Sequence, residues 1–253
     1  MKSSLLKIAI VWIALLPAVG RAGSFQVIPI RLFVGARATS TALTVTNLGD
    51  DKTTVQLQAR AWTQDAEGRD VYAPTKDLLF FPKMFTMQKE QEMIVRISYQ
   101  GDPSRDRERT YRLFVEELPM SDTAGNTVQM PLRLGIPVFM KASGESERGA
   151  IEKIETVAGI LQVKVKNTGN RHLMVKNIQA TGIDSTGAPV FDENASGWYV
   201  LPGASRVFSL NLPEEHCRKA IAAKITLTTD GVRLQSDSVL NPGQCAGLKA
   251  NAQ

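Results

Sequence analysis

Apolar side chains occupy every second position along several short stretches of this chain, the spacing typical of strands with one buried face. Two such runs are Met93–Ser98 and Arg206–Leu212. Turn-forming residues separate the runs at intervals of about ten residues, and no long stretch repeats its apolar residues at the helical period. The pattern predicts an all-β fold built from short strands.

The clearest alternation lies between residues 128 and 139. Its apolar positions are Val128, Met130, Leu132, Leu134 and Ile136, with Pro131 and Pro137 between them. Proline has no backbone N–H, so two prolines of the same parity leave one edge of a strand short of hydrogen-bond donors. The strand is therefore expected at or near a sheet edge.

A long apolar edge strand that carries little charge can readily pair with a strand of another chain. We therefore expect this segment to bind another protein by β-strand addition, and the same edge could pair two copies of this chain as a self-dimer. The alternation alone also fits a second interpretation, in which these side chains fill the core of their own domain.

The chain divides near its middle, at the small and polar stretch Lys141–Gly149. The patterns on either side resemble each other, because Leu43–Gln58 and Gln162–Asn177 both read as a strand, an Asn-x-Gly turn and a second strand. We expect two immunoglobulin-like β-sandwich domains, at residues 23–143 and 144–253.

The first 22 residues have the features of a secretory signal. Two lysines precede the apolar run 8–19, and Gly20 and Ala22 supply the small residues that a signal peptidase needs. Cleavage near Ala22 would leave 253 − 22 = 231 residues and lower the formal charge from +5 to +2, because three basic residues leave with the signal. The apolar run is shorter than the ~20 residues that span a bilayer. We expect an exported protein that is not membrane-embedded and does not bind nucleic acid.

Cys217 and Cys245 are the only cysteines in the sequence. An even number of cysteines in an exported protein favours a disulfide, which here would close a loop of 28 residues and contribute about 3 kcal/mol. A redox or metal site is the less favoured alternative, because the chain has no Cys-x-x-Cys motif and no nearby set of ligands.

Enzyme chemistry finds little support in the sequence. His172 follows a turn and is expected to be exposed, and neither histidine belongs to a nucleophile and base motif. Glu116 and Glu117 are adjacent in a predicted strand, so their side chains point to opposite faces and cannot share a substrate. We expect no enzymatic activity and no cofactor.

The segment Glu108–Pro119, followed by the alternating strand, resembles the signature of periplasmic pilus-assembly chaperones, the PapD-like family. Shorter matches run along the chain, at Ile30–Val34, Val45–Gly49, Ala59–Asp65, Met93–Ser98 and Thr228–Gly231. The first domain carries most of this resemblance. The ending Ile136–Phe139 is more similar to the archaic branch of the family.

The resemblance implies a periplasmic chaperone that holds pilus (fimbrial) subunits lacking their last strand. The chaperone lends its own edge strand to the subunit until an outer-membrane usher exchanges it. The donated side chains would be Val128, Met130, Leu132 and Leu134. The rival interpretation is an exported immunoglobulin-like adhesin or structural pilus component, which would use the same edge for permanent assembly.

In this family an arginine on the first strand grips the terminal carboxylate of the subunit, and Arg31 is the matching residue. A guanidinium on an otherwise apolar strand calls for an anionic partner, and its planar shape suits a carboxylate. The second basic anchor of the family, a lysine, is replaced here by Pro137. Lys141, Arg133 or Arg112 could take its place, and the sequence does not choose among them.

The resemblance also implies an ion network between the two domains. The matching residues are Arg96, Glu108 and Asp230. A partly buried network of this kind would fix the angle between the domains, because removing one member leaves an unpaired charge. The alternative is a set of unrelated surface pairs that contribute almost nothing to stability.

Overall fold

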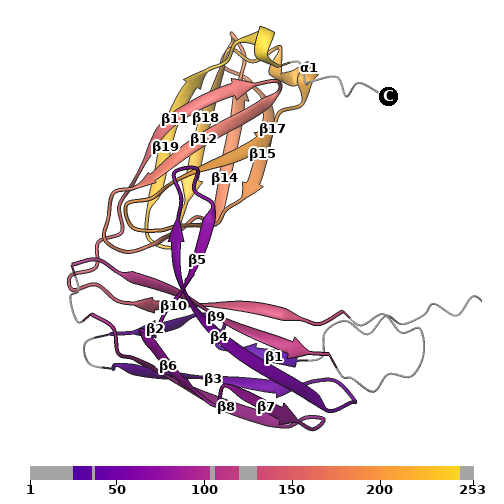
Figure 1. The fold of residues 1–253 in the computed structure, drawn as a ribbon. Coiled ribbons are helices and arrows are strands. Elements are labelled where there is room, and N and C mark those ends of the chain that lie inside the picture. Colours follow the sequence, from indigo (N-terminus) through magenta and orange to yellow (C-terminus); the bar gives the residue numbers. More distant parts are fainter. Residues whose placement is uncertain (1–24, 36–37, 103–105, 120–129, 246–253) are drawn as a thin grey trace, which may run out of the picture.

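The computed structural model describes residues 25–35, 38–102, 106–119 and 130–245. The predicted signal sequence and Val128 lie outside these residues. Within them the chain forms two β-sandwiches that meet at an angle (Figure 1). The predicted all-β fold with two sandwich domains is confirmed. Residues 141–148, which contain no strand, join the last strand of the first sandwich to the first strand of the second.

The first sandwich packs two sheets face to face, and their strands pair antiparallel except for β2. One sheet orders its described strands as β1 (Phe25–Ile28), β3 (Ser40–Asn47), β8 (Glu92–Tyr99) and β6 (Leu78–Phe81). The other follows the order β2 (Leu32–Val34), β10 (Arg133–Met140), β9 (Arg109–Leu118), β4 (Thr53–Gln64) and β5 (Asp70–Pro74), with β7 (Met84–Met87) also paired to β4. The short strand β2 joins β10 in parallel.

Alternation along the strands builds the core of this sandwich. Successive side chains of a strand point to opposite faces, so the apolar residues of each strand meet between the two sheets. Fully buried examples from both sheets are Val45, Val95, Ile97, Val55, Leu113 and Val115. The opposite face of the β9 and β4 sheet carries larger and more polar residues, and it is this face that meets the second domain.

The second sandwich is formed by β11 (Gly149–Val157), β12 (Ile160–Asn167) and β17 (Ser205–Asn211) on one side. On the other side lie β15 (Pro189–Ser196), β14 (Asn177–Ile183), β18 (Ala222–Thr228) and β19 (Arg233–Val239). The short strands β13 (Leu173–Met174) and β16 (Tyr199–Val200) pair at the end nearest the first domain.

A disulfide bond fastens the far end of the second sandwich. It joins Cys217, in the short helix α1 (Glu214–Cys217), to Cys245, which follows the 3-10 helix η1 (Pro242–Gln244). Both sulfur-bearing side chains are buried in the core. The predicted Cys217–Cys245 pairing is confirmed. None of the helices in the described ranges has the length and hydropathy needed to cross a bilayer.

The internal similarity of the two halves has a structural counterpart in two buried asparagines. The Asn47 side chain accepts a hydrogen bond from Gly49 N at 2.9 Å and donates to the carbonyl oxygens of Asp51 and Met87. Asn167 accepts from Gly169 N at 2.9 Å and donates to the carbonyls of Arg171 and Val200. Each amide holds a turn and ties it to a second segment, which satisfies polar groups that water cannot reach.

Candidate functional site

Within the part of the chain that the structure describes, strand β10 has an open edge along its first half. It pairs with β9 from Arg133 to Met140, whereas β2 reaches only Val138, Phe139 and Met140 on the other side. Glu117 N donates to Leu132 O, so the even-numbered residues bond to β9 and the odd-numbered residues direct their backbone groups to the other edge. The N–H that Pro137 lacks would have pointed to that other edge. The proline therefore removes no hydrogen bond between β10 and β9.

The apolar face of β10 changes from buried to exposed toward its N-terminal end. Ile136, Val138 and Met140 belong to the core of the first sandwich. Leu132 and Leu134 are half-buried against that core, and Met130 is 86% exposed. The sequence predicted a strand from Val128, whereas β10 begins at Arg133, two residues after Pro131, which has no backbone N–H to donate. Val128 lies outside the described residues. The interpretation as core side chains therefore holds for Ile136, whereas Leu132 and Leu134 are only partly covered and Met130 is exposed.

Arg112 lies on β9 beneath this open edge, inside a cage of aromatic rings. Its guanidinium carbon is 3.9 Å from the ring centre of Trp62, 5.4 Å from that of Trp198 and 5.6 Å from that of Tyr199. Nη1 reaches across β10 and donates to Gly135 O at 2.9 Å. Nε and Nη2 are buried and have no hydrogen-bond partner. A buried guanidinium in this state is costly, and an anionic partner would relieve it.

Arg31 lies between the first two strands and contacts the second domain. Its Nη1 is 3.3 Å from a carboxylate oxygen of Asp230, and its side chain is 40% exposed. Burial raises the pKa of the Tyr199 hydroxyl, whereas the charges of Arg31 and Arg112 act in the opposite direction. Both guanidinium groups therefore lie close enough to Tyr199 to influence the same hydroxyl.

The other two cations proposed as the second anchor have acidic partners. Lys141 Nζ is 3.5 Å from Glu145, and Arg133 Nε is 3.6 Å from Glu116. Arg112 makes no ion pair with any residue that the structure describes, so it is the strongest of the three candidates for binding an anion from outside.

The predicted ion network between the domains is replaced by two separate contacts. Glu108 is buried and binds His172, with Nδ1 at 2.8 Å from Oε1 and the backbone N of His172 at 2.9 Å. Asp230 binds Arg31 and, at 3.0 Å, Lys176. Arg96 is exposed on β8, in the opposite sheet from Glu108, and has no ion pair among the described residues.

His172 was expected to be exposed and is in fact 1% exposed. Its ring stacks on Phe139 with a centroid distance of 3.9 Å, and its Nδ1 faces Glu108 from the other domain. No local pattern predicts this role, because Glu108 is 64 residues away in the sequence and Phe139 also belongs to the other domain. His172 is buried because the turn before it lies at the junction of the domains rather than on the free surface.

Asp230 carries the second contact between the domains. Burial raises its pKa, but the hydrogen bonds and positive charges of Lys176 and Arg31 outweigh burial and hold the pKa below its usual value. The carboxylate is therefore kept ionised by both domains, since Arg31 belongs to the first and Lys176 to the second.

A long hairpin forms a third contact that the sequence did not reveal. Strands β4 and β5 extend beyond the first sandwich and lie alongside the second (Figure 1). Near the tip, Arg206 donates to Gly68 O at 2.7 Å, and Trp198 Nε1 donates to Asp70 at 2.8 Å. Gln64 also bonds the backbone of Leu201 and Tyr199. These bonds tie the hairpin of the first domain to the second domain.

The described residues contain no group of three or more His, Cys, Asp or Glu side chains placed to bind a metal ion. The arrangement instead combines an unpaired strand edge, half-buried apolar side chains and a caged guanidinium. These are the features of a surface that binds another polypeptide.

Comparison with known proteins identifies a family of assembly chaperones. Residues 24–144 match the family described as pili and flagellar-assembly chaperone, PapD N-terminal domain. A search of curated proteins finds no match.

Solved structures share the fold of both domains, over 85% to 87% of this chain. One is a chain of the CsuC–CsuE chaperone–tip adhesion subunit pre-assembly complex from archaic chaperone-usher Csu pili of Acinetobacter baumannii, with a TM-score of 0.62 and 18% identity over 85% of this chain and 98% of that one. The YadV chaperone has a TM-score of 0.58 and 14% identity over 86% and 100% of the two chains. A chain of the Salmonella enterica SafA pilin complex with the SafB chaperone has a TM-score of 0.54 and 19% identity over 87% and 98%.

The family match covers the domain that carries the open edge of β10 and the caged Arg112, and the fold of both domains is that of pilus chaperones, which are not enzymes. The N-terminal domain of this chain, residues 24–144, belongs to the PapD family of pili and flagellar-assembly chaperones, and the two domains together share the fold of solved pilus chaperones.

Proposed function

We propose that this protein is a periplasmic chaperone that binds pilus subunits by donating the open edge of β10 and delivers them to an outer-membrane usher. The observation that carries the proposal is the unpaired edge from Arg133 to Pro137, which lies next to half-buried and exposed apolar side chains. A subunit that lacks one strand could pair with this edge and cover those side chains.

The apolar contribution comes from Met130, Leu132 and Leu134. Full burial of an aliphatic side chain is worth about 1.5–3 kcal/mol. Leu132 and Leu134 already pack against the chaperone core, so each would contribute less than that, whereas the exposed Met130 has nearly its whole surface left to bury. Val128, which the sequence analysis also predicts as a donor residue, would extend the same face, although it lies outside the described residues.

The end of the added strand would meet Arg112. The guanidinium binds Gly135 O at the open edge of β10, so a terminal carboxylate that pairs near Gly135 would lie beside the two unpartnered nitrogens. Arg31 and the Tyr199 hydroxyl could donate further hydrogen bonds to this carboxylate. If Arg31 turned toward the subunit, Asp230 would still be paired with Lys176. We therefore propose Arg31 and Arg112 together as the carboxylate anchor.

The donor edge can be tested by co-expressing the protein in a bacterial periplasm with the pilin-like protein encoded beside it. Met130→Glu places a charge on a side chain that is 86% exposed, so the fold should survive while subunit capture is lost. Val239→Glu is the matched control, because Val239 is 88% exposed on an edge strand of the second domain. Equal capture by Met130→Glu and Val239→Glu would contradict strand donation.

Leu132→Glu extends this test into the half-buried part of the strand. We expect it to abolish capture with the fold retained, as judged by circular dichroism. Loss of the folded spectrum would mean that Leu132 belongs to the core of its own domain and is not donated.

The anchor can be tested by a double-mutant cycle. Arg112→Gln should weaken the complex by about 2 kcal/mol or more, a roughly thirtyfold loss of affinity. A subunit whose chain is extended by one residue past its natural end should bind as weakly, and combining the two changes should cost little more. Independent, additive losses would show that Arg112 does not bind the carboxylate, and the same cycle applies to Arg31→Gln.

The same preparations separate the chaperone from a structural pilus component. A chaperone should leave the periplasm as a stoichiometric, soluble complex with the subunit. Polymers of this chain, or its appearance on the cell surface, would instead support the adhesin alternative.

A further inference from the structure

Pro137 lies at the point where the open edge of β10 ends. The bond from Glu117 N to Leu132 O shows that the odd-numbered residues of β10 present their backbone groups to this edge. Arg133 and Gly135 therefore direct their N–H groups toward an incoming strand, whereas Pro137 has no N–H to direct. Gly135 is thus the last residue before the pairing with β2 whose N–H can serve a new ladder.

The fold also closes the edge at this position. Pro137 is buried, whereas Gly135 is half-buried and Arg133 is exposed. From Val138 onward the edge is already paired with β2. A strand that a subunit adds along the open edge, here called the guest strand, would meet this filled region if it continued beyond Gly135.

The two cations proposed as the carboxylate anchor lie at the same level. Arg112 is the partner of Pro137 in the pairing of β9 with β10, and its Nη1 donates to Gly135 O at 2.9 Å. Arg31 directly precedes β2, whose pairing with β10 begins at Val138. The two guanidinium groups thus belong to the segments that flank β10 where its free N–H groups end.

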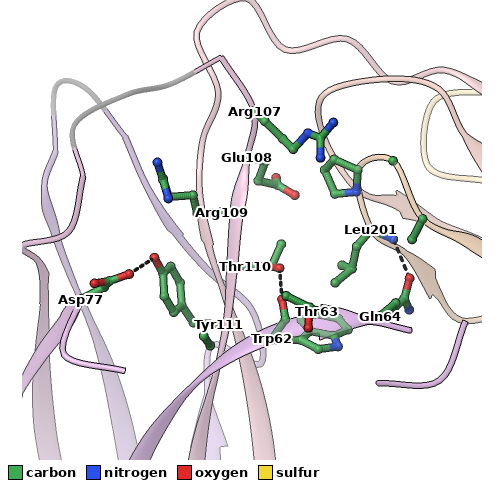
Figure 2. A pocket seen from close by; sticks show the side chains of 14 residues that line it. Trp62, Thr63, Gln64, Asp77, Arg107, Glu108, Arg109, Thr110, Tyr111 and Leu201 are labelled. Carbon is green, nitrogen blue, oxygen red and sulfur yellow. Dashed lines mark hydrogen bonds between the residues drawn. The ribbon is translucent and has the colours of Figure 1, made fainter. Parts of the chain in front are cut away.

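Arg112 is held at this level by the junction of the domains. Its guanidinium carbon is 3.9 Å from the ring centre of Trp62. Trp62 is itself fixed, because its carbonyl oxygen accepts a hydrogen bond from the Thr110 hydroxyl, and Gln64 on the same strand accepts one from Leu201 N at 2.9 Å (Figure 2). The cation therefore has a defined place before any subunit arrives.

The alternation of side chains leaves the register of a guest strand open in steps of two residues. A shift of two keeps the same side chains on the apolar face, so that face does not exclude it. A shift that carries the guest chain past Gly135 would, however, place a carbonyl oxygen opposite Pro137, where no N–H is available. A buried acceptor without a donor is costly, whereas a carboxylate at this level could take its hydrogen bonds from the arginines.

We propose that Pro137 is a specificity-determining residue that sets the register of the guest strand and the point at which it ends. Gly135 N gives the last bond of the ladder, and the guest chain terminates at the level of Pro137. The site therefore selects a strand that ends there in a free carboxylate over one that continues. This inference rests on the proposed strand donation and adds the position at which the donated ladder stops.

Amide hydrogen exchange, followed by NMR on the isotope-labelled mature protein, tests the ladder residue by residue. The protein is compared free and in complex with the pilin-like protein encoded beside it, and Pro137→Ala supplies the missing N–H as a probe. We expect the subunit to slow exchange at Arg133 and Gly135 and to leave the amide of residue 137 as it is in the free variant. Slower exchange at residue 137 in the complex would overturn the proposal, because the guest strand would then continue past Gly135.

A subunit lengthened by two residues at its C-terminus tests the selection itself. The quantity compared is the ratio of affinities for the natural and the lengthened subunit, since lengthening removes the terminal carboxylate from the anchor in every variant. We expect this ratio to be about tenfold smaller for Pro137→Ala than for the natural sequence, the effect of one buried acceptor that regains its donor. Pro137→Val, which also restores the N–H and fills more of the volume of the buried ring, should give the same result.

Pro189→Ala is the matched control, because Pro189 is exposed at the start of the edge strand β15 in the second domain. It should keep the natural ratio, and equal ratios for Pro137→Ala and Pro189→Ala would overturn the proposal. Unchanged exchange at Arg133 and Gly135 in the complex would instead refute strand donation itself, and the proposed end of the ladder with it. The two failures are therefore told apart by which amides respond.

Discussion

Gly68 lies at the tip of the β4–β5 hairpin, where the hairpin touches the second domain. Its φ is +79°, and a Cβ atom there would lie 2.5 Å from Ser205 O and 2.7 Å from Arg206 Cα. Both contacts are with the second domain, and contacts this short cannot be tolerated without movement. Gly68→Ala should therefore loosen the hairpin from the second sandwich as well as strain its own turn.

The chain offers a matched control in Gly187. Gly68 N donates to Asp65 O, and Gly187 N donates to Asp184 O; in both turns the aspartate side chain accepts two backbone N–H groups. The φ of Gly187 is +86°, and its Cβ would meet nothing within 4 Å. Gly187→Ala thus carries the same backbone cost without the contact between domains.

The magnitudes follow from these geometries. An alanine in the left-handed region costs about 1–2 kcal/mol, partly offset by the smaller conformational freedom of the unfolded chain. We expect a loss of about 1 kcal/mol for Gly187→Ala. Overpacking adds about 1–3 kcal/mol, so Gly68→Ala should lose about 2–4 kcal/mol if the hairpin stays docked. If the hairpin moves away instead, the bonds at Arg206 and Trp198 are lost.

Two measurements distinguish these effects. Urea unfolding compares the stability of both variants with that of the natural protein, with each domain's transition fitted separately because a two-domain chain need not unfold in one step. Pulsed dipolar spectroscopy with one spin label on each domain reports their arrangement. The reasoning is refuted if both variants lose the same free energy and show the same distance distribution between domains.

Three further predictions concern buried or charged groups. Asn167→Ala should destabilise the second domain by about 3 kcal/mol, because it leaves buried backbone groups unpaired; urea unfolding measures the loss, and an unchanged midpoint would contradict it. His172→Phe should cost about 3–5 kcal/mol because it removes the imidazole from the buried Glu108 and leaves it the backbone N–H of residue 172, and adding Glu108→Gln should recover part of that loss. The pKa of Asp230 is lowered in the folded protein, so its contact with Arg31 should be intact at neutral pH and lost as the pH falls through that folded value, below 3.8. Distances between the domains would follow this transition, and Asp230→Asn should show the low-pH arrangement already at pH 7.

The sequence predicted the strands well because their signal is local. Alternation along Met93–Ser98 and Arg206–Leu212 corresponds to β8 and β17, and the disulfide between Cys217 and Cys245 followed from the parity and context of two cysteines. The Asn-x-Gly turns were visible as well. The sequence did not show that the side-chain amides of Asn47 and Asn167 also bind the backbone of distant segments, at Met87 and Val200, because those contacts exist only in the folded chain.

The alternating segment shows that a local pattern does not determine how deeply each apolar side chain is buried. Leu132 and Ile136 have the same parity and similar side chains, yet Ile136 is core and Leu132 is half-buried. The difference comes from β2, which covers only the end of β10. A periodic pattern gives the face of a strand, but the neighbours of that strand decide how much of the face meets solvent.

The sequence by itself determined the two-sandwich fold, the edge character of the prolines' strand and a short set of cations that could bind a carboxylate. Only the tertiary structure shows which of those cations have acidic partners, because an ion pair depends on which charges the fold brings together. Arg133 and Lys141 meet acids, while Arg112 meets aromatic rings and a carbonyl. For the same reason the structure replaced the expected network of Arg96, Glu108 and Asp230 with the pairs Glu108–His172 and Asp230–Arg31, whose members are distant in sequence and adjacent only after both domains have packed.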